Sequence, residues 1–246
     1  AGSFRPIAVS APNGSMLNPR HPAPVRARME VCSRAWNAIM KALAQAAPDK
    51  VIACGTDTTT SFVLSHLGEA GWSVYLEIFG GGFGAANDTD GCDGVDNPLS
   101  NCSNTPVEAL DQDFSFFRVV DYALSTDSCG AGRHRGGLGF TRSFEALKDN
   151  VRVSLYSDRF RRPAEGLFGG GPGSTGSCVV RRGDAVIALK SKDAMDLKRG
   201  DVVVLSVGGG GGYGDPRERP EDQIEADVAD GFISRPVARD WARRGA

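Results

Sequence analysis

The sequence predicts an α+β protein with a helix-containing N-terminal part, a mostly antiparallel, glycine-rich β region and a short helical tail. Three observations predict this class. Apolar residues recur at helical spacing between residues 25 and 47. From residue 115 onward, short apolar runs are separated by Gly and Pro, as in antiparallel sheets. That half lacks the strand–helix–strand alternation of a doubly wound parallel sheet. We therefore expect three segments along the chain: 1–112, 113–219 and 220–246.

The N-terminal segment is expected to begin with a strand over Phe4–Ser10, followed by a proline-rich loop. A helix then spans Val25–Ala47, and Pro48 ends it. Its apolar face consists of residues at three- and four-residue steps: Val25, Met29, Cys32, Trp36, Ile39, Met40 and Leu43. A strand follows over Trp72–Phe79, where alternation places four apolar side chains on one side: Trp72, Val74, Leu76 and Ile78.

The β region contains six expected strands: Phe116–Leu124, Gly139–Leu147, Val151–Tyr156, Cys178–Arg181, Ala185–Leu189 and Val202–Val207. The chain has 32 glycines, many of them in runs such as Gly80–Gly84, Gly169–Gly173 and Gly208–Gly214. A period of three is missing, which excludes collagen. We interpret the runs as turns between short strands. Two short helices are expected in the tail, at Glu221–Gly231 and Ser234–Arg244.

Composition excludes several classes of partner. The formal net charge is -2, so there is no basic excess to attract nucleic acid or an anionic membrane. Basic runs such as Arg159–Arg162 are interpreted as solvated edges. The sequence shows no signal peptide and no apolar run of membrane-spanning length. None of the six cysteines forms a C-x-x-C pair, so we expect mostly reduced thiols in a cytoplasmic protein, with a Cys92–Cys102 disulfide as a minor alternative.

Two motifs suggest ligand sites. The acidic loop Asp88–Asp96 has the residue types that calcium prefers, but it departs from the EF-hand order, and Asp and Gly also form ordinary turns. A solvated loop is the preferred interpretation. The glycine runs lack the Gly-Lys-Ser/Thr of a P-loop and do not lead from a strand into a helix, so no nucleotide site is expected on this chain.

Two polar turns supply the candidate site residues. His134 lies between two arginines in the segment Gly130–Gly137, where it acts either as a structural loop residue or as part of a site. The turn Asn104–Glu108 fits a helix cap, with Asn104 or Thr105 as N-cap, but it fits the lining of a cleft as well. The candidate residues are Asn104, Thr105, Glu108, Arg133, His134 and Arg135.

Several motifs, in this order, resemble one family. They are Phe4–Ile7, Ala11–Ser15, Leu17–Pro24, Ala42–Gln45, Gly80–Ala85, Asn104–Glu108, Ser128–Gly137, Gly166–Gly173 and Gly208–Pro216. The block Ser128–Gly137 is the most specific, because it is similar to S-G-G-A-G-x-x-R-G-G with Cys129 in place of the second glycine. Together they resemble the C-terminal half of a hydantoinase B/oxoprolinase-type subunit. Relatives include ATP-dependent hydantoinases, 5-oxoprolinases, lactam-opening enzymes, and acetone and acetophenone carboxylases.

The resemblance implies one piece of a multi-subunit enzyme that is inactive alone. A partner hydantoinase A-type subunit would bind ATP and Mg²⁺ and phosphorylate the substrate, and the B-type component would then hydrolyse a cyclic amide, hydantoin or oxoproline-type ring. The family's metal-binding motifs lie in an N-terminal half that has no counterpart here. We therefore expect no cofactor on this chain, a divalent metal on a second chain that carries that half, and an exposed apolar face where the two meet.

Three further functions stay open. The first is a subunit of a related ATP-dependent ketone carboxylase, since the family contains both reactions. The second is an assembly module that kept the fold and lost the reaction. The third is an independent calcium- or carbohydrate-binding β protein, which the acidic loop and the glycine-rich β half allow.

Overall fold

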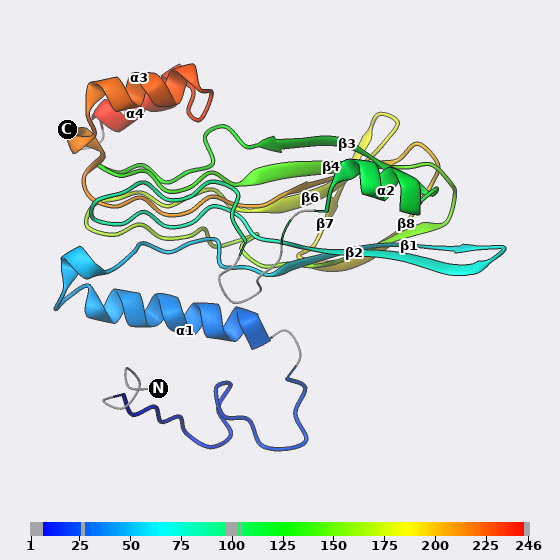
Figure 1. The fold of residues 1–246 in the computed structure, drawn as a ribbon, viewed down its shortest axis with the longest axis horizontal. Helices are drawn as coiled ribbons and strands as arrows, with labels where there is room; N and C mark the ends of the chain where they lie inside the picture. Colours follow the sequence, from blue (N-terminus) through cyan, green and yellow to red (C-terminus); the bar gives the residue numbers. More distant parts are fainter. Residues whose placement is uncertain (1–6, 26–27, 97–102, 104, 244–246) are drawn as a thin grey trace.

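Two antiparallel sheets form the centre of the protein (Figure 1). The structure, a computed structural model, describes residues 7–25, 28–96, 103 and 105–243. Among them, one sheet has the strand order β2-β1-β5-β8 and the other has the order β3-β4-β9-β6-β7. The strands are β1 (Thr60–Gly68), β2 (Gly71–Phe79), β3 (Phe117–Leu124), β4 (Phe140–Ala146), β5 (Val151–Tyr156), β6 (Ser177–Arg182), β7 (Ala185–Leu189), β8 (Lys192–Leu197) and β9 (Val202–Ser206).

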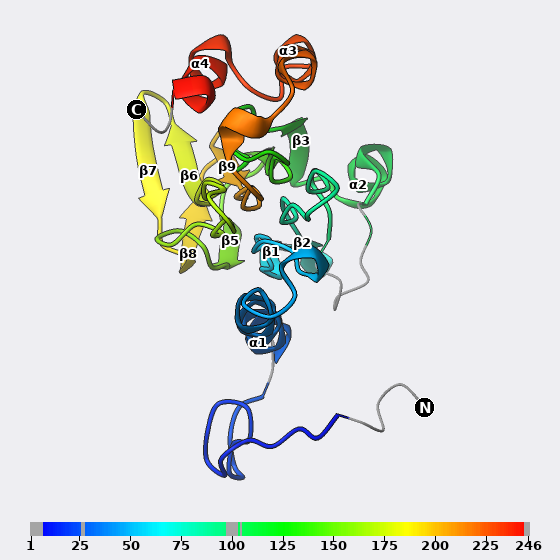
Figure 2. The same ribbon diagram turned by 90° about the vertical axis from the view of Figure 1, so that its left-hand side faces the viewer.

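The helices lie outside the sheets. They are α1 (Arg28–Leu43), α2 (Val107–Asp113), α3 (Glu221–Ala229) and α4 (Arg235–Arg243), and two short 3₁₀ helices are η2 (Pro48–Lys50) and η3 (Pro216–Glu218). α1 lies on one side of the molecule, and α3 and α4 lie on the opposite side (Figures 1 and 2). The α+β class with a short helical tail is confirmed.

An aromatic core joins the two sheets. Phe62 on β1 stacks on Phe144 on β4, with 4.6 Å between ring centroids. Tyr75 on β2 packs against Phe117 on β3 at 4.9 Å. These side chains are almost completely buried, and burying an aromatic side chain contributes about 1.5–3 kcal/mol relative to leaving it exposed. The core lies between the sheets because alternate residues of each strand face inward.

The glycine runs are mostly not turns, although Phe168 and Gly169 do form one. Six extended segments lie side by side beyond the ends of the strands and hydrogen-bond laterally, although none of them is a regular strand (Figure 1). We call these segments the glycine bundle: 52–56, 80–86, 91–95, 128–139, 164–173 and 207–214. For example, the Gly210 N–H donates to the Gly137 carbonyl at 2.8 Å, and the Gly137 N–H donates to the Phe83 carbonyl at 2.8 Å. A Cβ on Gly210 would overlap the carbonyl oxygen of Phe83, so the backbones approach too closely for side chains.

One expected strand is not formed by its described residues, and two observed strands were not expected. Residues 7–10 of the expected strand Phe4–Ser10 form no strand and are exposed, because no neighbouring strand pairs with them; Phe4–Pro6 lie outside the described residues. Two strands were not expected from the sequence. β1 begins within the polar run Thr56–Ser61, and β8 carries charged residues and forms the edge of a sheet.

The apolar residues expected on one side of α1 and of β2 do share a side, but that side is mostly exposed, although Met40 of α1 is buried. Cys32, Trp36, Ile39 and Leu43 are exposed on α1, whereas Glu30, Ser33 and Asn37 are buried. On β2, Trp72, Val74 and Leu76 are exposed, and the opposite face with Tyr75, Glu77 and Phe79 packs into the core. Within the described residues, no helix has the length and apolar character needed to cross a bilayer.

Candidate functional site

The structure places the predicted site residues in two separate regions. Thr105 and Glu108 lie at α2, and Arg133, His134 and Arg135 lie in the glycine bundle below α3, at the other end of the long axis (Figure 1). Asn104 lies outside the described residues. The two polar turns therefore do not form a single site.

Thr105 belongs to a buried ion pair between the sheets. Arg142 on β4 pairs with Glu77 on β2, with 2.7 Å between Nη1 and Oε2, and the Arg142 side chain is 0% exposed. The Thr105 N–H donates to Glu77 Oε1 at 3.1 Å, and its carbonyl accepts from Arg142 Nη2 at 3.3 Å. The residue before the first turn of α2 is Pro106, with no side-chain capping bond, and Glu108 is exposed in that turn. Thr105 is therefore not the N-cap, because its backbone serves the ion pair instead.

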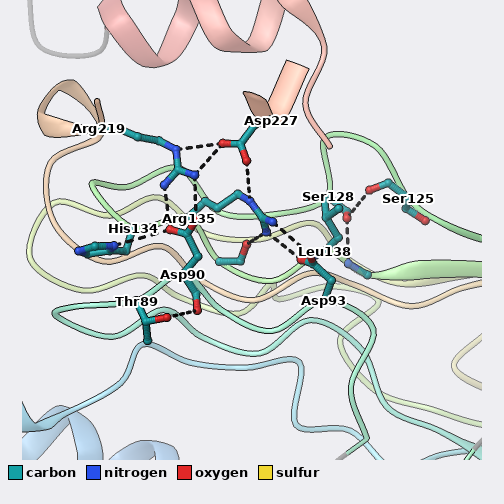
Figure 3. A network of polar contacts seen from close by, with 12 residues as sticks. Thr89, Asp90, Asp93, Ser125, Ser128, His134, Arg135, Leu138, Arg219 and Asp227 are labelled. Carbon is teal, nitrogen blue, oxygen red and sulfur yellow. Dashed lines mark hydrogen bonds and ion pairs between the residues drawn. The ribbon is translucent and has the colours of Figure 1, made fainter. Parts of the chain in front are cut away.

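The second region is a network of alternating charges (Figure 3). The Arg135 guanidinium donates to both oxygens of Asp93, at 2.7 and 3.1 Å, and to Asp227 Oδ1 at 3.1 Å. Arg219 donates to both oxygens of Asp90 at 2.8 Å and to Asp227 Oδ2 at 2.9 Å. Bidentate pairs of this kind fix geometry as well as charge. The network fastens α3, which carries Asp227, to the glycine bundle.

The arginines control the charge state of this network. Burial alone would raise the pKa of Asp90, but the Arg219 guanidinium outweighs burial and lowers that pKa. Burial alone would likewise lower the pKa of Arg135, and the hydrogen-bonded Asp93 carboxylate raises it instead. Asp90, Arg135 and Arg219 therefore stay charged near neutral pH. Asp90 and Asp93 already have guanidinium partners.

The acidic loop is therefore neither a calcium cage nor merely solvated. Its carboxylates Asp90 and Asp93 accept hydrogen bonds from guanidinium and backbone N–H groups. Among the residues that the structure describes, no group of three or more His, Cys, Asp or Glu side chains is placed to hold a metal ion. The described residues therefore offer no site for the divalent metal that the resemblance implies.

His134 lies at the rim of this network. Its Nδ1 is 3.7 Å from Asp90 Oδ1, which is longer than a direct hydrogen bond. An open pocket of about 380 Å³ lies beside it, lined also by Asp88, Thr89 and Gln223. Of the three predicted residues in this region, His134 is the one that lines the pocket. Arg133 and Arg135 instead hydrogen-bond to neighbouring segments of the chain. Arg133 donates to the Asn87 carbonyl and side chain, each at 2.9 Å.

A second polar cluster, between α1 and the loop before β1, is absent from the sequence analysis. Glu30 Oε1 accepts from the Thr59 N–H at 2.6 Å. Three buried oxygens there have no hydrogen-bond partner among the described residues: Glu30 Oε2, Asp57 Oδ2 and Thr59 Oγ1. Burial raises the pKa of Glu30 and that of Asp57. Unpartnered buried oxygens are costly, so this cluster is suited to accept a polar ligand.

The loop of this cluster has an uncommon backbone. Asp57 has φ +44°, a conformation that few non-glycine residues adopt. Thr56 stabilises the turn by donating its hydroxyl to the Gly208 carbonyl at 2.5 Å. The signal for this site was present in the sequence as polar residues one helical turn apart, at Glu30, Ser33 and Asn37.

Comparison with known proteins then decides the family. The family model for hydantoinase B/oxoprolinase matches residues 1–216, which is most of the chain. The chain belongs to the hydantoinase B/oxoprolinase family. The resemblance read from the ordered motifs is confirmed.

Three similar proteins illustrate this hydantoinase B/oxoprolinase family. The B-type component of a D-/L-hydantoinase from Pseudomonas sp. (strain NS671), so named by similarity, is 32% identical over 97% of this chain and 40% of its own length. The crystal structure of an ATP-dependent caprolactamase from Pseudomonas jessenii is 26% identical, with a TM-score of 0.85 over 98% of this chain and 44% of that one. A nucleotide-free acetone carboxylase has a TM-score of 0.68 at 15% identity over 84% of this chain and 32% of that one, which shows the fold alone.

The chain spans about two fifths of the length of relatives such as the hydantoinase component. Family members named among these relatives include that component and the β-type component of a caprolactamase. These two relatives are thus named as subunits, whereas in the 5-oxoprolinase from Dictyostelium discoideum the matched region is 16% of one longer chain.

Proposed function

We propose that this chain is the C-terminal part of a B-type component in an ATP-dependent, multi-subunit enzyme that opens a cyclic amide. The observation that carries the proposal is the match to the ATP-dependent caprolactamase over 98% of this chain at a TM-score of 0.85. The similarity to the B-type component of a hydantoinase points to the same class of reaction. A ring-opening hydrolase is therefore favoured over a ketone carboxylase, for which the structural neighbour is only 15% identical.

The proposal divides the work among three chains. An A-type partner binds ATP and Mg²⁺ and phosphorylates the substrate oxygen, because an amide carbonyl is a poor electrophile and a phosphorylated oxygen is a better leaving group. The divalent metal would be held by a chain with the N-terminal half of the B component, where it would supply Lewis-acid chemistry. This chain supports the site with the loop that carries Arg133, His134 and Arg135. Its contribution is positioning and substrate contact.

Reconstitution tests this division. The chain is co-produced with the A-type subunit and the N-terminal B-type chain of its own host, and ring opening of hydantoin, 5-oxoproline and caprolactam is followed with and without ATP. We expect ATP-dependent ring opening only when all three chains are present. Turnover of a ketone that requires bicarbonate would instead establish the carboxylase. A stable complex without either activity would establish the assembly module.

The predicted site loop has its own test within that complex. Arg133→Ala is expected to lower turnover, whereas Arg118→Ala, which removes an exposed arginine of β3, leaves it unchanged. Circular dichroism and melting of the complex show whether the variant has folded. Full turnover in the Arg133→Ala complex would remove this loop from the proposed site. A monomer that binds no partner and melts at higher temperature with calcium would replace the whole proposal by the independent binding module.

A further inference from the structure

A basic pocket lies between α1 and the connection from β5 to β6. Its volume is about 670 Å³. Four arginines line it, Arg34 from α1 and Arg159, Arg161 and Arg162 from the connection, together with Asp158 and Glu165. Arg161 and Arg162 are exposed, and Arg34 and Arg159 are half-buried. The pocket is therefore open to solvent on the side of Arg161 and Arg162, and the half-buried Arg34 and Arg159 form its other side.

The two acids do not neutralise these arginines. Asp158 pairs with Lys192, with 2.5 Å between Oδ1 and Nζ, and Glu165 pairs with Lys41. Within the described part of the chain, none of the four arginines lies within ion-pair distance of a carboxylate. Four guanidinium groups thus face one cavity, and none of them forms an ion pair with the two acids that line it. Charge of one sign in a concave site concentrates ligands of the opposite sign.

Arg159 is held firmly in this position. Its backbone has φ +60°, which is strained for a residue with a side chain. Its guanidinium donates to three carbonyls, those of Gly55 at 3.3 Å, Thr56 at 3.2 Å and Pro163 at 2.9 Å. Carbonyls fix the side chain without cancelling its charge. Burial, followed by the neighbouring Arg34 charge, lowers the pKa of Arg159, and the carboxyls of Asp57 and Glu165 offset only part of that shift.

The groups behind the pocket do not supply the missing anion. Glu30 is one helical turn from Arg34 on α1, and Arg34 donates to the Thr56 carbonyl at 3.4 Å and to Thr58 Oγ1 at 3.1 Å. The carboxyls of Glu30 and Asp57 are both buried, and burial favours their neutral forms. Glu30 is only 6% exposed, and its Oε2 has no hydrogen-bond partner among the described residues.

We propose that this pocket binds a small molecule through an oxyanion, either a phosphoryl or a carboxylate group. Guanidinium groups match the geometry of both anions. The proposal goes beyond the function proposed above and does not depend on it, because it rests on the charges of this chain and is tested by binding. The basic run Arg159–Arg162, interpreted from sequence as a solvated edge, becomes one wall of a binding site.

Isothermal titration calorimetry of the whole chain tests the pocket. Pyrophosphate and glutarate serve as the phosphoryl and carboxylate probes, at constant ionic strength near that of about 150 mM salt, where exposed charges are screened within about 8 Å. The variant Arg161→Gln/Arg162→Gln removes two exposed arginines that line the pocket. The control Arg181→Gln/Arg199→Gln removes the same charge from exposed positions elsewhere. We expect the pocket variant to weaken binding at least about tenfold, equivalent to about 1.4 kcal/mol, and the control to change it less than about twofold.

Each outcome decides the proposal. Saturable binding of pyrophosphate with this pattern supports it and identifies a phosphoryl ligand. The same pattern with glutarate supports it and identifies a carboxylate ligand. Equal loss in both double variants would show attraction by net charge alone and would overturn it. The absence of saturable binding up to about 10 mM of either probe would overturn it as well, leaving a solvated edge.

Discussion

At the scale of single residues, Arg142 and Glu77 show what a buried charge requires. The pair joins β4 to β2 between the sheets, and neither side chain is more than 4% exposed. Arg142→Met leaves the Glu77 carboxylate buried without a counter-charge. We expect a loss of about 3–5 kcal/mol in the free energy of unfolding, measured by urea denaturation.

The matched control for this ion pair is Arg152→Met. Arg152 pairs with Asp196 between β5 and β8, with 2.7 Å between Nη1 and Oδ1, but both side chains are about half exposed. An exposed pair contributes less than about 1 kcal/mol. Similar losses in the two variants would show that burial does not set the strength of the Arg142–Glu77 interaction.

Glu30 is a residue whose contribution depends on pH. Burial raises its pKa above the ordinary value of 4.5, so the folded state binds a proton more tightly than the unfolded state does. The contribution of Glu30 to the free energy of unfolding is therefore complete below about pH 4. It is lost as the pH rises through the pKa of Glu30 in the folded state. Glu30→Gln removes that dependence. Relative to the wild type, the variant should become more stable as the pH rises from 4 to 8, by about 1.4 kcal/mol for each unit by which burial raises the pKa.

Urea unfolding at several pH values measures this difference directly. The other titrating groups, including Asp57, are common to both proteins and cancel in the comparison. A difference between wild type and Glu30→Gln that stays constant across this range would contradict the buried, proton-binding role of Glu30.

Single residues also show the limit of sequence reasoning at the candidate site. The block around Arg135 was found, because its residue types and order are specific. Its partner Asp227 is 92 residues away, and Arg219 and Asp90 are 129 residues apart. Nothing in the local pattern pairs them, so the acidic loop and the arginine loop were interpreted separately. The fold alone brings them together.

At the scale of elements, the glycine bundle depends on the absence of side chains. We expect Gly210→Ala to cost more than about 4 kcal/mol or to prevent folding, because the new methyl group overlaps the backbone of the segment that contains Phe83. Gly68→Ala is the control. A Cβ there meets only the edge of the His66 ring at 3.9 Å, and we expect a change of less than about 1 kcal/mol.

Melting temperature and far-ultraviolet circular dichroism of the two glycine variants check this prediction. A Gly210→Ala protein as stable as Gly68→Ala would show that the bundle segments can move apart. The sequence predicted that the glycines matter but not how, because runs of glycine look the same in a turn and in a close-packed bundle.

The same elements show which parts of the fold follow from local pattern. Most strands and the two C-terminal helices were predicted with small errors at their ends: β3 to β7, β9, α3 and α4. In each of them, the residue pattern of the sequence matches the element that forms. Which face of α1 and of β2 is buried does not follow from local pattern. Both elements carry two unlike faces, and in both the less apolar face is mostly the buried one. Here the buried faces hold Glu30 and Glu77, which have partners on distant parts of the chain.

At the scale of the whole molecule, the outward-facing apolar side chains of α1 and β2 leave apolar surface exposed. Trp36 is 48% and Ile39 51% exposed on α1, beside a pocket of about 410 Å³ with an almost entirely apolar lining. Exposed apolar patches of this kind mark interaction surfaces. The chain spans about two fifths of the length of relatives such as the hydantoinase component, so we expect this face to pack against the chain that carries the N-terminal half of the B component.

Trp36→Ala tests this expectation, because aromatic side chains dominate the affinity of such interfaces. We expect it to weaken binding of the N-terminal B-type chain by at least about 2 kcal/mol, or roughly 30-fold, in calorimetric titration. Val186→Ala, on β7 and 67% exposed, is the control and should change the affinity by less than about 0.5 kcal/mol. Unchanged affinity in Trp36→Ala would place the partner elsewhere. Because the indole is half in water, the variant chain alone should keep its fold, so a loss of affinity reports on the interface and not on unfolding.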